Sequence, residues 1–525
     1  MVWIQVADEQ QLREKGAMVI RRDKHQLAVF LLEDEAFAID NRCPHEGYPL
    51  KEGSIDGKNC VLTCQWHNWK FDLRTGKSLL GEDNVRAYPT RFSDGQLWVD
   101  VTEPSQEERE EKIRQGLRIG FNKRQYGRMT REVARLLTAG IKPEGAIREV
   151  IRGAYDKLEY GTTHAYPAAV DWLAHYDSAT DDVETQIICI TELLDHFSED
   201  TLRQDTYPFI AEVRDFDGEA FLDAVEAEDE NLAVAMVRGA LNDGLGWQEL
   251  EPFFARAALS HMFDFGHTLI YLAKTGELLA RLGEDLALYL LLPFTRKLCY
   301  GTREDMLPDF RAYAAVLADR PHSFGTQETG LDGKDLFGLS IEKVLKQTRQ
   351  WCVTHRPEAV WAALQEAGAR NMLHHDTSYG FAYNNAVKHN VGWLDVTHAI
   401  TFGSGVRHIC ANYPTLWYEG LLQMACFIGR NKSYVDAQLN GADWKVGDRE
   451  TFLKTCFEKI LDHGLGQNIF SCHLLKTATA ISRDLAYLSA DRSELLLAAL
   501  NRFFNSPIKQ KHARRMARQA LTLLK

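Results

Sequence analysis

Two short segments near the N-terminus combine cysteine and histidine at spacings that suit a metal centre. Cys43-Pro44-His45 has the pattern Cys-x-His, and Cys64-Gln65-Trp66-His67 has the pattern Cys-x-x-His, with eighteen residues between them. Each segment offers one thiolate and one imidazole, so together they supply two ligands of each kind. Such a set can bind zinc, or it can hold the two irons of an iron–sulfur cluster with different ligands on each iron.

The mixed spacing favours the cluster over zinc. Zinc fingers usually pair cysteine with cysteine and histidine with histidine, whereas each segment here mixes the two. Trp69, Phe71 and the Thr75-Gly76 turn follow the second segment. Apolar cover of this kind limits the access of water to a cluster and tunes its potential.

These segments resemble those of the Rieske ferredoxins and of the Rieske domains of ring-hydroxylating oxygenases. The resemblance covers residues 1–101 and implies a [2Fe–2S] cluster, with Cys43 and Cys64 on one iron and His45 and His67 on the other. Respiratory-type Rieske proteins also tie the two loops with a disulfide, but Gly47-Tyr48 occupies the place of the first extra cysteine. A potential at the lower, ferredoxin-like end of the range is therefore expected.

Histidines also occur in apolar helical segments further along the chain. Three patterns place a carboxylate and an imidazole on one helix face: Asp264/His267, Asp395/His398 and Glu192/His196. Helical proteins that bind metals use this geometry, with ligands projecting from facing helices into a bundle core. The alternative is structural, because a histidine on an apolar helix is often a core residue that is hydrogen-bonded to its neighbour. The sequence leaves an additional non-haem iron site open.

Three of these segments resemble parts of the questin oxidase-like proteins. They are residues 163–173, 266–272 and 396–401, which carry His164, His267 and His398. The resemblance implies Baeyer–Villiger-type oxidative cleavage of polyketide quinones and makes these three histidines the candidate catalytic residues. It leaves open whether they bind metal, polarise a substrate carbonyl or transfer protons.

The elements that must position these residues differ between the two ends of the chain. Residues 27–32 and 36–39 flank an acidic turn, and the Asp94-Gly95 turn joins residues 91–92 to 97–99, so two hairpins are predicted. Helical periodicity dominates from residue 127, with segments at 129–140, 143–151, 475–504 and 509–524. We predict a multidomain α and β protein: an all-β Rieske domain at 1–102, a charged linker or first helix at 103–126, and an all-helical, candidate catalytic domain at 127–525.

Composition limits the classes of partner. The chain has 525 residues and a net charge of −13, which argues against nucleic acid and anionic lipid as partners. No uncharged apolar run is long enough for a membrane helix. Residues 1–6 read as a strand rather than a secretory signal, and the ten cysteines are scattered, so we expect a reducing, cytoplasmic location.

These observations predict an oxidoreductase in which a Rieske domain passes single electrons from a separate reductase to the helical domain. The helical domain would oxidise a small organic substrate with O2. Two alternatives stay open. The helical part is a docking scaffold for a separate enzyme that the protein reduces, or the protein is a redox sensor whose helical part responds to the state of the cluster.

Overall fold

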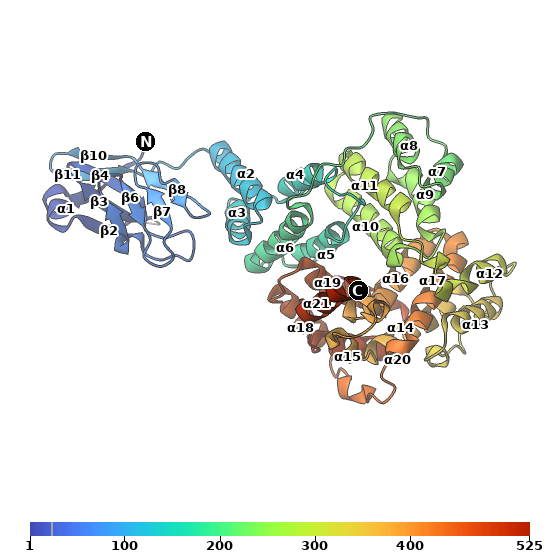
Figure 1. Ribbon diagram of the computed structural model, residues 1–525. Helices are drawn as coiled ribbons and strands as arrows, with labels where there is room; N and C mark the ends of the chain where they lie inside the picture. Colours follow the sequence, from blue (N-terminus) through green and yellow to red (C-terminus); the bar gives the residue numbers. More distant parts are fainter. Residues whose placement is uncertain (23–24, 525) are drawn as a thin grey trace. The chain divides into compact units, whose positions relative to one another are not determined.

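The computed structural model describes residues 1–22 and 25–524. Contacts divide the chain into two compact units, residues 1–143 and the region from Glu144 onward. The predicted fold class is confirmed: an all-β region is followed by a large helical one (Figure 1).

Three antiparallel sheets build the N-terminal region. Their strand orders are β1-β11-β10, β2-β3-β4-β9 and β5-β6-β7-β8. The elements are β1 (Trp3–Asp8), α1 (Glu9–Lys15), β2 (Ala17–Arg22), β3 (His25–Leu32), β4 (Glu35–Asp40), β5 (Ser54–Asp56), β6 (Val61–Thr63), β7 (Lys70–Asp72), β8 (Ser78–Leu80), β9 (Ala87–Tyr88), β10 (Thr90–Ser93) and β11 (Gln96–Asp100).

Both predicted hairpins are confirmed. Strands β3 and β4 pair up to Leu32 and Glu35, and β10 and β11 pair up to Ser93 and Gln96. Asp94 and Gly95 both have positive φ, as a tight two-residue turn with an Asp-Gly sequence requires.

Strand β3 is buried on both faces. Because successive side chains point to opposite faces of a strand, Leu27 and Val29 belong to one apolar core and Phe30 to a second. Cys43 and Cys64 lie in the second core, beneath the loops that carry them.

Two helices, α2 (Gln106–Asn122) and α3 (Tyr126–Thr138), belong to the same compact unit as the sheets. Ser105 and Glu108 form a capping box at the start of α2, which explains why the charged segment is a helix rather than an open linker. The predicted boundaries at 102 and 127 stay a prediction about which segments fold independently.

The region from Glu144 onward is helical, and through residue 524 it contains β-bridges but no strand. Its helices are α4 (Glu144–Ala154), α5 (Ala165–Ser178), α6 (Val183–Thr201), α7 (Gly218–Glu226), α8 (Glu230–Asn242), α9 (Trp247–Leu259), α10 (His267–Leu282), α11 (Ala287–Tyr300), α12 (Ala312–Ala318), α13 (Ile341–Thr354), α14 (Pro357–Leu373), α15 (Ser378–Phe381), α16 (Trp393–Asn412), α17 (Trp417–Asn431), α18 (Arg449–Leu461), α19 (Asn468–Asp484), α20 (Ala490–Phe504) and α21 (Ala513–Leu523).

The predicted helix at 475–504 is two helices, α19 and α20. A 3-10 turn at Leu485–Tyr487 separates them, and Ser489 stands at the N-cap position of α20. Serine favours that position, a local signal that apolar periodicity alone does not carry. Among the described residues, no helix has both the length and the apolar character that a membrane crossing requires.

Candidate metal centres

Two loops with the same backbone pattern carry the four predicted cluster ligands. In the first, the Cys43 amide donates to the Tyr48 carbonyl (2.9 Å), and the Gly47 amide donates to the Cys43 carbonyl (2.8 Å). Gly47 has φ +78°, the left-handed conformation that glycine adopts without steric cost. The second loop repeats these two hydrogen bonds (2.8 and 3.1 Å) and the positive φ with Cys64, Asn68 and Trp69.

The loops bring the donors together in two pairs, one of thiols and one of imidazoles. Cys43 and Cys64 are buried, and their thiols are close enough to interact, whereas His45 and His67 are more exposed and place their Nδ1 atoms 3.0 Å apart. Burial raises the pKa of the Cys43 thiol to about 11, so a bound cation is needed to keep it as a thiolate. Two thiols on the buried side and two imidazoles on the outer side fit a [2Fe–2S] cluster with mixed ligands.

Aromatic rings cover both imidazoles. The Trp69 ring stacks on His45, with centroids 4.9 Å apart and 17° between the planes. The Trp66 ring stacks on His67 at 5.3 Å and 15°, and Trp66 is itself exposed. The cover on the His45 side is therefore held within the domain, and that on the His67 side faces solvent.

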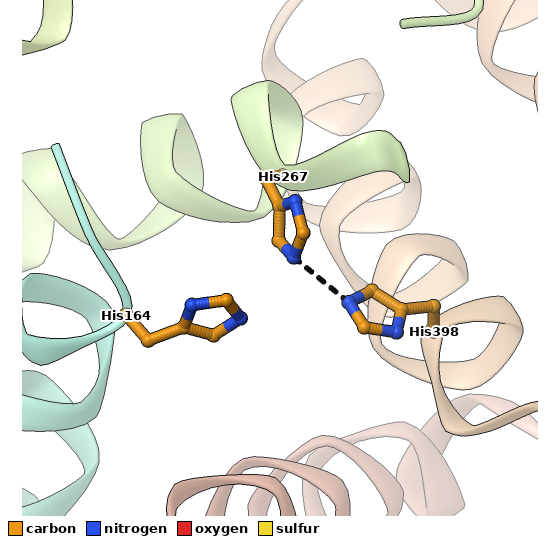
Figure 2. A group of neighbouring side chains, drawn as sticks. All are labelled: His164, His267 and His398. Carbon is orange, nitrogen blue, oxygen red and sulfur yellow. Dashed lines mark hydrogen bonds between the residues drawn. The ribbon is translucent and has the colours of Figure 1, made fainter. Parts of the chain in front are cut away.

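The structure brings the three candidate histidines of the helical region together. His164 immediately precedes α5, His267 begins α10 and His398 lies in α16. One ring nitrogen from each lies within 4.8 Å of the others. Figure 2 shows the three rings pointing toward one another from three different elements, with the His267 and His398 Nε2 atoms 2.9 Å apart.

Each of these imidazoles has a partner at its Nδ1 atom. The His398 Nδ1 donates to the Leu394 carbonyl, which can only accept. The His267 Nδ1 faces the Asp264 carboxylate at 3.6 Å, and the His164 Nδ1 lies 3.2 Å from the Tyr271 hydroxyl. Histidines that bind metals are held in this way, with one ring nitrogen on an outer partner and the other directed at the metal.

The facing Nε2 atoms of His267 and His398 lie within hydrogen-bond distance, so either a proton or a bound metal ion can lie between them. Burial lowers the pKa of His398 well below its usual value and also lowers that of His267, so both rings are neutral. A neutral His398 that donates from Nδ1 has a lone pair on Nε2. His267 must then direct a lone pair either at that nitrogen or at the Asp264 carboxylate.

Sequence reasoning missed three further residues of this site. His473, in α19, lies with its ring centroid 5.2 Å from that of His164 and 5.1 Å from that of His398. Its Nδ1 donates to the Ile469 carbonyl (2.6 Å), and its buried Nε2 has no hydrogen-bond partner among the described residues. The others are Tyr271 and Lys476. The available signal was a histidine and a lysine three apart in an apolar helix.

Lys476 adds a buried ammonium group beside the histidines. Its Nζ has no hydrogen-bond partner in the described part of the chain, and burial lowers its pKa to about 8. It lines a cavity of about 60 Å³ together with Asp171, Lys274 and His408. That volume holds a few water molecules but no organic substrate, so the cavity suits proton transfer.

A strained turn positions His267. Asp264, Phe265 and Gly266, just before α10, all have positive φ, which is rare for an aromatic residue. The Phe265 amide donates to the Glu304 carboxylate (3.2 Å), and the Phe265 ring packs against His398 with centroids 4.7 Å apart. Strain of this kind persists only where surrounding contacts enforce it, and it clusters at functional sites.

The carboxylates proposed as ligands each have a partner of their own. Asp264 faces the outer nitrogen of His267 and pairs with Lys297 (2.9 Å). Asp395 caps α16 by accepting from the Gly392 amide (2.8 Å). Glu192 lies 3.1 Å from the His463 Nε2, and the His196 Nε2 is 4.0 Å from Asp200. The structure therefore keeps Asp264 and His267 in contact and also groups His267 with His164 and His398.

Known proteins resemble the N-terminal region. The ferredoxin component of the p-cumate 2,3-dioxygenase system of Pseudomonas putida is 39% identical over 80 residues, which are 15% of this chain and 66% of that protein. The 3-phenylpropionate/cinnamic acid dioxygenase ferredoxin subunit of Photorhabdus laumondii is 35% identical over 79 residues, 15% of this chain and 74% of that protein. The 4beta-methylsterol monooxygenase of Methylococcus capsulatus is 29% identical over 115 residues, and the chain spans about a third of its length (31%).

Residues 2–89 match the Rieske [2Fe-2S] domain family. This stretch contains both loops and all four donors, and the family implies a [2Fe–2S] cluster rather than zinc. Through this electron-transfer module, the chain belongs to the Rieske [2Fe-2S] domain family.

Proposed function

We propose that the chain is an oxidoreductase with two working parts. The Rieske domain takes single electrons from a separate reductase, and the helical region uses them to oxidise a small organic substrate with O2 at His164, His267 and His398. The observation that carries this proposal is the 2.9 Å approach of the His267 and His398 Nε2 atoms inside a buried histidine cluster.

A metal ion accounts for that approach better than a proton does. A proton on the His267 Nε2 would either leave the Nδ1 lone pair facing the Asp264 carboxylate or, with Nδ1 also protonated, create a buried imidazolium, which desolvation opposes. Imidazole nitrogen suits iron, zinc, copper and nickel, and an electron-transfer domain on the same chain favours a metal that changes oxidation state. We therefore assign a non-haem iron to His164, His267 and His398, with His473 as a fourth imidazole. Such an iron supplies O2 activation, while the residues bind it, fix its ligands through their Nδ1 partners and exclude bulk water.

The electron balance suits a one-electron carrier. Inserting one oxygen atom of O2 into a substrate releases the other atom as water and consumes two electrons and two protons. A Rieske cluster carries one electron at a time, so it must be reduced twice in each turnover. The names of the relatives support pairing a Rieske domain with an oxygenase reaction, since one relative is a monooxygenase and the others belong to dioxygenase systems. Lys476 and its water-sized cavity offer a route for the protons.

A second candidate function is electron delivery to a separate enzyme, with the helical region as a docking scaffold. The observation that favours it is the match to ferredoxin components of multi-protein systems. The histidine cluster would then hold no redox metal.

Iron in the helical region separates the two candidates. We expect the dithionite-reduced protein to bind NO and give an iron–nitrosyl EPR signal besides the Rieske signal. His164→Gln, His267→Gln and His398→Gln should each lower this second iron at least about tenfold and abolish turnover, with the Rieske signal intact. His375→Gln, at a buried histidine whose Nδ1 lies 3.3 Å from the Tyr434 carbonyl, is the matched control. A nitrosyl signal that survives all three substitutions, or is absent from the unsubstituted protein, would exclude this site.

A further inference from the structure

We propose that the helical hairpin α2–α3 is part of the electron-transfer domain and that its Arg131 raises the reduction potential of the cluster. The family match ends at residue 89, so the hairpin lies beyond it. The inference rests on the Rieske domain alone, and its test is independent of the histidine site.

Arginines of α3 hold the hairpin onto the sheet region. The Arg131 Nε lies 3.2 Å from the Asp83 carboxylate, and the Arg135 Nη2 lies 3.0 Å from it. Arg128 donates to the Glu82 carbonyl at 2.6 Å. Asp83 is only 4% exposed, and a buried carboxylate is stable only when cations and hydrogen bonds compensate it. Helix α3 supplies those cations, so it completes the domain.

Arg131 also lies close to Trp69, the aromatic residue that covers the cluster ligand His45. Its guanidinium lies 5.9 Å from the centre of the Trp69 ring, which stacks on the predicted ligand His45 at 4.9 Å. Gly81 packs so closely that a Cβ there would lie 2.5 Å from a Trp69 ring atom, which leaves the indole little room to move. The contacts therefore fix a positive charge one aromatic ring away from a ligand.

Charge of this kind favours the reduced cluster. Reduction adds one electron from an external donor and changes one Fe³⁺ to Fe²⁺, so the net charge of the cluster becomes more negative by one unit. A nearby cation stabilises that added charge. The Arg131 side chain is 21% exposed, so solvent screens it only in part. Removing the charge should lower the potential even though Asp83 partly neutralises it.

The test is an EPR-monitored redox titration of the full-length holoprotein with Arg131→Gln. We expect the substitution to make reduction about threefold to tenfold less favourable, where tenfold corresponds to about 59 mV for a one-electron couple. Arg131→Lys keeps the charge and should retain most of the potential. Arg114→Gln, which breaks a partly buried pair with Glu110 inside the hairpin, is the control and should leave the potential unchanged.

An unchanged or raised potential in Arg131→Gln, with an intact Rieske signal, would overturn the proposal. So would an equal fall in Arg131→Lys, because the effect would then come from packing and not from charge. If Arg131→Gln does not retain its cluster, a double variant that combines it with Asp83→Asn removes both charges of the ion pair. Comparing the potential of this double variant with that of Asp83→Asn alone then isolates the effect of the Arg131 charge. No difference in potential between those two proteins would equally overturn it.

Discussion

At the scale of single residues, Glu304 shows how one side chain supports the histidine site. Its carboxylate accepts from the Phe265 amide (3.2 Å) and so helps to hold the strained turn before His267. Burial raises its pKa to about 7, because water no longer stabilises the charged form. The folded protein therefore retains a proton that the unfolded chain releases near pH 4.5.

This shift predicts a pH-dependent difference between the native protein and Glu304→Gln. Because the folded-state pKa is raised, its contribution to stability is fully present below about pH 4.5 and is lost as the pH rises through about 7. Glutamine imitates the protonated form at every pH. Urea unfolding followed by circular dichroism should show similar stability at about pH 4 and a more stable variant at pH 8. A difference between the two proteins that is the same at both pH values would show that Glu304 does not titrate in this range.

At the two candidate metal centres, the sequence identifies some functional residues and misassigns or misses others. The four cluster ligands lie within 25 residues of one another in two patterned loops, so their spacing identifies them. The left-handed conformation of Asn68, which lets the second loop match the first, carries no comparable signal. Asp395 shows the opposite failure. Its spacing from His398 suits a metal ligand, but three residues after Gly392 it also suits a helix cap, and the backbone uses it as one.

At the scale of elements, local signals predicted short segments better than long ones. The Asp94-Gly95 turn identified its hairpin because its conformation depends on those two residues. Gly140 and Glu144 likewise mark the end of α3 and the start of α4. The break between α19 and α20 was missed because both helices are apolar on the face that packs inward, so the periodicity continues across Ser489.

The packing of α3 depends on ion pairs that arginine makes with buried carboxylates. Arg135 pairs with Asp83 (3.0 Å) and with Glu132 (2.8 Å), and both carboxylates are about 4% exposed. Arg135→Gln leaves these charges with one cation fewer. Because the Arg135 side chain is 42% exposed and partly screened by solvent, the substitution should cost about 1 to 2 kcal/mol of stability. Arg114→Gln breaks a partly buried pair with Glu110 one turn away on the same helix and should cost about 0.5 kcal/mol. Urea unfolding followed by the visible absorbance of the cluster measures both, and equal losses would show that α3 does not stabilise the cluster domain.

At the scale of the whole molecule, the two candidate centres differ in how they are assembled. The cluster ligands come from two neighbouring loops. The histidine site instead draws on the residue before α5 and on helices α10, α16 and α19. Helix α10 contacts α5 and α16, and α19 also contacts α5 and α16; that packing depends on apolar faces along the whole helical region. A single sequence does not show which helix faces pack against each other. His473 could therefore not be grouped with the other three histidines.

The proposed function requires a definite number of irons and sulfides per chain. A Rieske domain accounts for two irons and two sulfides per chain, and the proposed histidine site adds one iron without sulfide. Removing that iron with a mild chelator should leave the cluster spectrum unchanged, since the two centres share no ligand residue.

The most direct test of the central claim is anaerobic EPR of the dithionite-reduced protein, with iron and sulfide measured on the same sample. We expect a rhombic signal with a low average g value, two sulfides per chain and iron clearly above two per chain. The same signal with equal iron and sulfide would contradict the histidine-bound iron and leave an electron carrier. A sample reconstituted with iron and sulfide that gave no rhombic signal would contradict the Rieske cluster itself.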